Sequence, residues 1–200
     1  MSIPTQRNKA YDILREMGVA RSKELFSRGI APSTIRRLVD QGLVERISRG
    51  LYRLADATPS AHTALVDVTK CIPRSVICLL SALAYHGLTT QLPHQIWVAI
   101  HPKSRRPQVS LPVRIFRFSG PSLTEGIDIH TIDGIDVRIY CAAKTVADCF
   151  KFRNKIGIDI AIEALRNYIN RRVGSIDELW HYAKICRITT VITPYLEALT

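Results

Sequence analysis

The sequence predicts a mixed α/β protein of the α+β class, built in two parts. Three observations lead to this prediction. Helical patterns and a glycine-containing hairpin are crowded into the first 55 residues, short β-branched and aromatic segments follow between residues 95 and 140, and a helical period returns after residue 142. A short polar break with a proline, residues 56–60, separates the parts. We therefore expect one domain at residues 1–56 and a larger α/β domain at residues 60–200.

The first part contains three short helical patterns. Thr5 is expected to cap a helix that Gly18 ends, and Ser22 to cap a second helix that Gly29 ends. The third pattern starts at residues 31–33, Ala-Pro-Ser, and stops at Gly42. Two strand-like segments, residues 43–48 and 51–54, then flank a turn at residues 49–50, where glycine permits the positive φ of a tight hairpin. Three helices followed by a hairpin predict a winged helix-turn-helix domain.

The third helix of such a domain can enter the major groove of DNA with its N-terminal residues at the base edges. Ile35, Leu38 and Val39 fall on the inner face of this helix, and basic and hydroxyl side chains are left for the outer face. The hairpin, which would be the wing, can reach phosphates or the minor groove. The predicted DNA-binding residues are Ser33, Thr34, Arg36 and Arg37 on the helix and Arg46, Arg49 and Arg53 on the wing.

The charge distribution agrees with this placement. The whole chain has 28 basic and 17 acidic side chains and a net charge of +11, which favours a polyanionic partner. Residues 1–55 carry 11 of the basic and 5 of the acidic side chains, so more than half of the excess lies in little more than a quarter of the chain. Lysines and arginines near phosphates release counterions and add salt-sensitive affinity. We therefore expect the N-terminal part to bind duplex DNA.

The second part begins with two helical patterns, one capped by Ser60 and one that Ser75 opens and Gly87 ends. Strands are expected at residues 95–100, 113–118, 127–132 and 135–140, the last two joined by a hairpin turn at residues 133–134, Asp-Gly. From residue 142 the pattern is helical, with a cap at Ser175. The basic loop after the first strand offers a candidate second DNA contact at Lys103, Arg105 and Arg106, although such a loop can equally be a solvated surface.

No catalytic constellation is evident. Paired carboxylates, metal-ligand spacing, phosphate-cradling glycines and nucleophile motifs are not recognisable, so we expect no enzyme activity, metal or cofactor. Asp148 is expected to make a structural hydrogen bond or cap. The five cysteines are odd in number and have no close-spaced pair, which predicts reduced core thiols. Without a signal peptide or a long apolar run, we expect a cytoplasmic protein that does not bind membranes.

Residues 21–53 resemble the N-terminal domain of the AbiEi antitoxin family, most closely in GLVERISRGLYR at residues 42–53. Looser resemblances follow in order along the chain: SALAYHGL at residues 81–88, IWVAI at 96–100 and AKTVAD at 143–148. The resemblance implies an antitoxin of a type IV toxin-antitoxin or abortive-infection system that acts in phage defence. Such a protein represses its own promoter by binding inverted repeats and counteracts a nucleotidyltransferase-like toxin. It also implies that the C-terminal domain carries the antitoxin activity.

Two other classes remain open at this point. An ordinary winged-helix regulator would use its C-terminal domain to sense a ligand or to form oligomers, with no toxin encoded nearby. A DNA-processing enzyme guided by the winged helix would cleave operator DNA in a metal-dependent manner, and the aspartates at residues 128, 133 and 136 are the only carboxylates that suggest it. Turn chemistry already accounts for Asp133.

Overall fold

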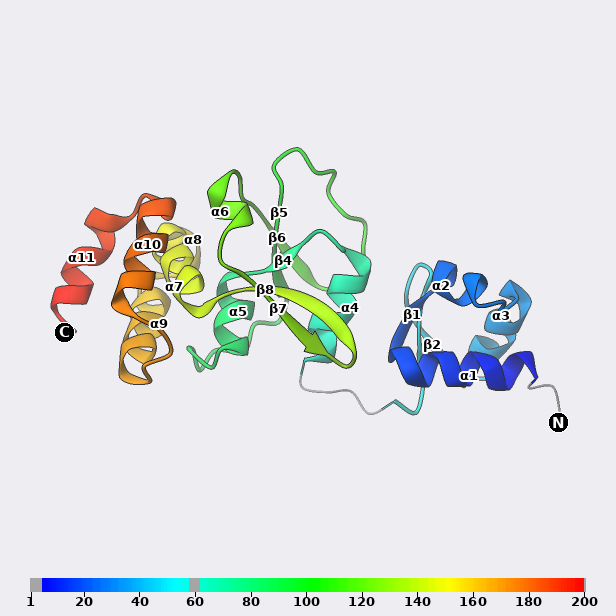
Figure 1. Ribbon diagram of the computed structural model, residues 1–200. Helices are drawn as coiled ribbons and strands as arrows, with labels where there is room; N and C mark the ends of the chain where they lie inside the picture. Colours follow the sequence, from blue (N-terminus) through cyan, green and yellow to red (C-terminus); the bar gives the residue numbers. More distant parts are fainter. Residues whose placement is uncertain (1–4, 58–61, 200) are drawn as a thin grey trace. The chain divides into compact units, whose positions relative to one another are not determined.

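The computed structural model describes residues 5–57 and 62–199, which fall into two compact units (Figure 1). The N-terminal unit comprises Met1–Pro73, Pro107–Leu111 and His130–Val137. The larger unit comprises Arg74–Arg106, Pro112–Ile129 and Arg138–Thr200. Each unit is described on its own below.

The N-terminal unit contains the three expected helices and the expected hairpin, in the expected order. The elements are α1 (Gln6–Met17), β1 (Val19–Arg21), α2 (Ser22–Ser27), α3 (Pro32–Asp40), β2 (Val44–Ser48) and β3 (Leu51–Leu54). β1 was not expected from the sequence. It pairs antiparallel with β3, so the hairpin becomes a three-stranded sheet in the order β1-β3-β2. This is the arrangement of a winged helix-turn-helix domain.

The ends of these helices follow the sequence with one exception. The Thr5 hydroxyl accepts a hydrogen bond from the Asn8 amide, and Gly18 ends α1 at a φ of 64°. Ser22, the expected cap of α2, is instead the first residue of that helix. The Arg21 amide donates to the Glu24 carboxylate at 2.6 Å, and the Ser22 hydroxyl donates to the Gly50 carbonyl at the hairpin turn. Arg21 is the last residue of β1, where it pairs with Leu51, and it takes the N-cap position of α2. α2 therefore begins at Ser22, one residue earlier than expected.

The core of this unit lies between the helices and the sheet. It is made of aliphatic side chains from every element: Ala10, Ile13, Leu14, Ala20, Leu25, Ile30, Ile35, Leu38, Val44 and Leu54. α1 and α3 contact one another, and both rest on the sheet strands. The inner face of α3 is thereby fixed, and its outer face is left to solvent.

α4 (Thr63–Cys71) belongs to the same unit, and His62 is its N-cap. The cap expected at Ser60 lies outside the described residues. Four residues of α4 at helical spacing make polar contacts with other segments of the unit: Thr63 with Asp133, Asp67 with Arg53, Lys70 with Glu24, and Cys71 with Ser48. These positions share one face of a helix with 3.6 residues per turn. α4 is therefore tied to α2 and to the hairpin.

A five-stranded mixed sheet is formed by strands between residues 76 and 140. Its strands are β4 (Val76–Ile77), β5 (Ile96–Ile100), β6 (Val113–Arg117), β7 (Ile127–Ile132) and β8 (Ile135–Tyr140), in the order β6-β5-β4-β8-β7. β5 and β6 are parallel, as are β4 and β8, whereas β4 and β5 are antiparallel. Asp133 and Gly134 have positive φ values of 50° and 73°, which confirms the turn expected between β7 and β8.

The helix expected from Ser75 begins later than the sequence suggested. Val76 and Ile77 form β4, opposite Ala99 and Val98, and the helix α5 spans Leu79–Tyr85. The expectation was wrong for these residues because an apolar run of this kind suits a buried strand as well as a buried helix. The β-branched side chains of Val76 and Ile77 favour the strand.

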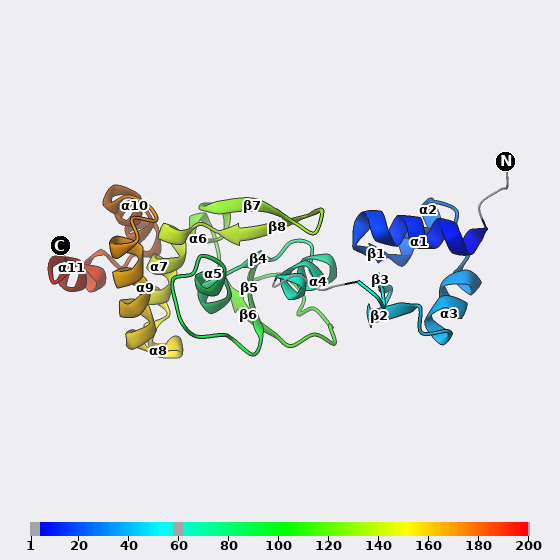
Figure 2. The same ribbon diagram turned by 90° about the horizontal axis from the view of Figure 1, so that it is seen from below.

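Helices make up the C-terminal part, as expected (Figure 2). They are α7 (Ala142–Lys151), α8 (Arg153–Ile156), α9 (Ile158–Asn170), α10 (Ile176–Cys186) and α11 (Thr189–Glu197). A short helix that the sequence did not predict, α6 (Pro121–Thr124), lies between β6 and β7. α7 is the central helix, since α5, α9, α10 and α11 all contact it. The Ser175 hydroxyl accepts from the Glu178 amide and caps α10, as the sequence predicted. All five cysteines are free thiols, and four of them are buried.

A buried ion pair lies within α7. Lys144 donates to the Asp148 carboxylate one turn along the helix, and both side chains are 0% exposed. The Lys144 ammonium also lies over the Tyr140 ring, and the Cys186 thiol donates to the other Asp148 oxygen at 3.2 Å. Burial raises the pKa of the Asp148 carboxyl, and Lys144 opposes this rise. The expected structural role of Asp148 is thus a buried, hydrogen-bonded partner for a lysine.

Candidate nucleic-acid interface

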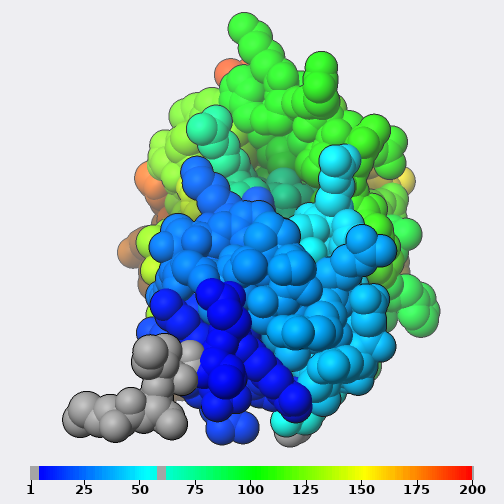
Figure 3. All heavy atoms as spheres, turned by 90° about the vertical axis from the view of Figure 1, so that its right-hand side faces the viewer, coloured from blue at the N-terminus to red at the C-terminus, as the bar shows by residue number. Residues whose placement is uncertain are grey.

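α3 presents a polar, basic outer face. Ser33, Arg36 and Arg37 are exposed, as the sequence predicted. Pro32 stands at the first helical position, where its missing N–H costs nothing and its fixed φ suits the helix. The domain to which α3 belongs faces the viewer in Figure 3, where α1, α2, α3 and the hairpin make one continuous surface in blue and cyan.

Thr34 is the exception on this helix. Its side chain is buried, at 5% exposure, so the outward position predicted for it is wrong. Thr34 precedes Ile35 by one residue and Leu38 by four, and at 3.6 residues per turn this places it on the same inward stripe. Thr34 therefore packs within the domain, and the exposed set on α3 is Ser33, Arg36 and Arg37.

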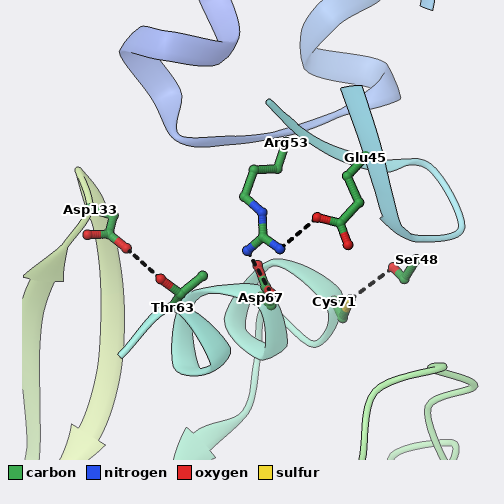
Figure 4. A network of polar contacts seen from close by, with 7 residues as sticks. All are labelled: Glu45, Ser48, Arg53, Thr63, Asp67, Cys71 and Asp133. Atoms are coloured by element: carbon green, nitrogen blue, oxygen red, sulfur yellow. Dashed lines mark hydrogen bonds and ion pairs between the residues drawn. The ribbon is translucent and has the colours of Figure 1, made fainter. Parts of the chain in front are cut away.

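The wing arginines separate into two groups. Arg46 and Arg49 are exposed on the hairpin, where they were predicted. Arg53 is only 17% exposed, and its guanidinium forms ion pairs with Glu45 at 2.9 Å and with Asp67 at 3.5 Å (Figure 4). The sequence reading that Arg53 is available to phosphates is therefore corrected, because two carboxylates already hold this side chain on β3.

Asp67 of α4, which forms an ion pair with Arg53, is a buried carboxyl group. Its side chain is 8% exposed, and its Oδ1 atom has no hydrogen-bond partner among the described residues. Burial raises the pKa of this carboxyl, Arg53 lowers it by a smaller amount, and Glu45 and Asp133 raise it further. Nearby, the Thr63 hydroxyl donates to the Asp133 carboxylate at 3.4 Å (Figure 4). These contacts join the wing to α4 and do not include the exposed Arg36, Arg37, Arg46 and Arg49.

A small basic hollow lies beside the hairpin turn. It has a volume of about 110 Å³, and its lining includes Arg21, Ser48, Arg49, Lys70 and Ser110. Lys70 also pairs with Glu24 at 3.1 Å. Sequence reasoning selected only Arg49 from this group. Arg21 lies on the unexpected strand β1, and Lys70 was assigned to the other domain, so only their positive charge pointed to them.

The basic residues of the loop after β5 do not all line the same hollow. Lys103, Arg105 and Arg106 are all exposed. Lys103 lines one hollow together with Arg74 and Arg138, whereas Arg106 lines a different one beside Arg114 and Arg117 on the edge strand β6. The three residues predicted as one contact therefore do not share a single concave surface.

Two further findings concern chemistry and membranes. Within residues 5–57 and 62–199, no three His, Cys, Asp or Glu side chains come close enough together to hold a metal ion. None of the helices in the same ranges is long and apolar enough to cross a bilayer.

Three helices, a hairpin wing and exposed arginines on the third helix define the N-terminal part as a member of the winged helix-turn-helix class. Residues 9–55 match the model of a family described as "Transcriptional regulator, AbiEi antitoxin". The resemblance predicted from the sequence is confirmed over this segment, which is similar to the transcriptional-regulator domain of AbiEi antitoxins. No curated protein matches the chain.

The fold of the whole chain is similar to a solved structure, "Crystal structure of RV2827C protein from Mycobacterium tuberculosis". The two are 15% identical, with a TM-score of 0.60, over 99% of this chain and 81% of that one. At this identity the likeness concerns the fold alone. It confirms the α+β class for a chain that carries both the regulator domain and the larger sheet-containing part.

Proposed function

We propose that this protein is a DNA-binding antitoxin of a type IV toxin-antitoxin system. It represses its own operon by binding inverted repeats in the promoter, and it counteracts a nucleotidyltransferase-like toxin without being an enzyme itself. The observation that carries the proposal is the exposed Ser33, Arg36 and Arg37 face of α3, within a domain that matches an antitoxin regulator family. In this proposal residues 1–56 bind DNA and residues 60–200 carry the antitoxin activity.

The exposure of each side chain decides which role we propose for it at the DNA. Arg36 and Arg37 reach base edges in the major groove, where the planar guanidinium can pair with both guanine acceptors, and Ser33 contacts the adjacent base or phosphate. Arg46 and Arg49 on the wing contact phosphates, joined by Arg21 and Lys70 around the small hollow. Arg53 and Thr34 hold the domain together and do not touch DNA.

A promoter-reporter assay tests the repressor half. The upstream region of the gene drives the reporter, and wild-type protein is compared with Arg36→Ala/Arg37→Ala. The matched control is Arg166→Ala/Lys184→Ala, which removes two exposed positive charges from α9 and α10. We expect repression by wild type and by the control, and none by the α3 variant. Equal repression by all three proteins would refute DNA reading by α3.

Co-expression with the product of the neighbouring toxin gene tests the antitoxin half. We expect the full chain to restore growth, and the Arg36→Ala/Arg37→Ala variant to restore it as well when expression is driven from an unrelated promoter. Repression without rescue would identify an ordinary winged-helix regulator whose larger domain senses a ligand or forms oligomers. Metal-dependent cleavage of the promoter DNA would contradict the binding-only proposal.

A further inference from the structure

Sheet register brings three basic residues of the larger unit to one end of the sheet. Val76 of β4 lies opposite Ala99 of β5 in an antiparallel pair, and continuing this register by two residues places Arg74 beside His101. β4 is also parallel to β8 through Ile77 and Ile139, which sets Arg138 level with Val76. Arg74, His101 and Arg138 thus come together although they are far apart in the sequence.

The loop that follows β5 is held in one shape by Arg117 of β6. The Arg117 guanidinium donates to the backbone carbonyls of His101 at 3.3 Å and Ser104 at 3.0 Å, and also to that of Pro102. Within the loop, the Lys103 amide donates to the His101 ring and the Ser104 amide to the His101 carbonyl. These hydrogen bonds fix the turn that carries Lys103 and Ser104. A ligand that binds there therefore loses less free energy to ordering the loop.

These segments border a surface hollow of about 640 Å³ that is open to solvent. Its lining residues are Arg74, His101, Lys103, Ser104, Leu123 and Arg138. The volume falls in the range of small-molecule sites, roughly 300–1,000 Å³, and far exceeds what one phosphate group needs. The lining includes two arginines and one lysine, and no carboxylate. A compact ligand with several negative charges would pair with all three cations. The planar guanidinium of arginine can donate two hydrogen bonds to a phosphate group, and lysine contributes a compact positive charge.

We propose that this hollow binds the oligophosphate chain of a small ligand, with a nucleoside triphosphate as the chemical class. Arg74, in the turn before β4, and Arg138 on β8 bind the phosphates, Lys103 neutralises a further charge, and the Ser104 hydroxyl donates a hydrogen bond. Duplex DNA is the poorer fit, because the cations converge into a concavity from three segments, whereas DNA presents a convex line of phosphates. Arg105 and Arg106 take no part, as they lie outside this lining.

Isothermal titration calorimetry on the full chain tests the proposal without any DNA present, so its outcome is independent of the proposed repressor function. The probes are inorganic tripolyphosphate, the common nucleoside triphosphates and orthophosphate. We expect tripolyphosphate and at least one nucleoside triphosphate to bind, and orthophosphate to bind far more weakly. The Arg74→Ala/Arg138→Ala variant should raise the Kd for tripolyphosphate about tenfold or more, because each charge-assisted hydrogen bond contributes enough for roughly that factor.

The control is again Arg166→Ala/Lys184→Ala, which should change the Kd less than about twofold, since neither residue lines the hollow and exposed charges outside it are screened by salt. Lys103→Glu, on an exposed loop, gives a second variant if Arg74 and Arg138 prove essential for folding, and it should also weaken binding. No binding of tripolyphosphate by wild type, or equal weakening in pocket and control variants, would overturn the proposal. So would an Arg74→Ala/Arg138→Ala variant that binds tripolyphosphate as tightly as wild type.

Discussion

At the scale of single residues, the same side chain has different roles according to its neighbours. Arg36 and Arg37 are exposed on α3, whereas Arg53 is held between Glu45 and Asp67. The sequence predicted all three as DNA-binding residues. For Arg53 the reason was that an arginine on a wing is ordinarily exposed to solvent. The partner that removes Arg53 from that surface, Asp67, lies in the next helix, and only the tertiary structure brings it near.

Removing Arg53 should destabilise the protein. Asp67 would be left as a buried carboxylate without its cation, which costs about 1–3 kcal/mol for a group of this kind. We expect Arg53→Ala to lower the free energy of unfolding by about that amount in urea titrations. Arg46→Ala, which removes an exposed arginine of the same hairpin, should change it by less than about 0.5 kcal/mol. Equal effects of the two substitutions would show that the buried pair is not structural.

The buried Asp67 also predicts a pH dependence. Burial raises the pKa of this carboxyl above its usual 3.8, so the folded state holds the proton more tightly than the unfolded chain. The stability that the group contributes is fully present below its ordinary pKa and is lost as pH rises through the raised value. Relative to wild type, Asp67→Asn should therefore become more stable as pH rises from about 4 to about 7. A pH-independent difference would contradict the raised pKa.

At the scale of elements, long periodic segments were predictable and short ones were not. The helices of the regulator domain, its hairpin and the β7–β8 turn match the sequence, because caps, glycines and hydrophobic period define them locally. β1 and β4 have three and two residues, too few to display an alternation, and they exist only through pairing with β3, β5 and β8. Their absence from the prediction also caused the misplaced starts of α2 and α5.

The ion pair inside α7 gives a prediction at this scale. Lys144→Met leaves Asp148 uncompensated in a fully buried site, and breaking such pairs costs about 3–5 kcal/mol. The double variant Lys144→Met/Asp148→Leu removes both charges and should lose less stability than the single variant. Lys184→Met, at an exposed position on α10, serves as the control and should be nearly neutral in thermal unfolding. A double variant less stable than Lys144→Met would contradict the cost assigned to an uncompensated Asp148.

At the scale of the whole molecule, the fold class and the N-terminal pattern of helices and hairpin could be predicted from the sequence, while the grouping of basic residues could not. Residues 9–55 carry a local, ordered pattern that predicts both fold and family. The strand order of the larger sheet brings Arg74, Lys103 and Arg138 together and separates Lys103 from Arg106. Strand order depends on pairings between distant segments, which one sequence without aligned relatives does not reveal.

The central claim is that the exposed face of α3 reads base edges. Its most direct test is a fluorescence-anisotropy titration of wild type and Arg36→Ala/Arg37→Ala against the upstream duplex and a scrambled duplex, at several salt concentrations. We expect the variant to lose about tenfold or more in affinity per arginine for the upstream duplex, and much less for the scrambled one. Equal loss on both duplexes with a shallower salt dependence would mean that these arginines contact only phosphates, and would contradict the claim.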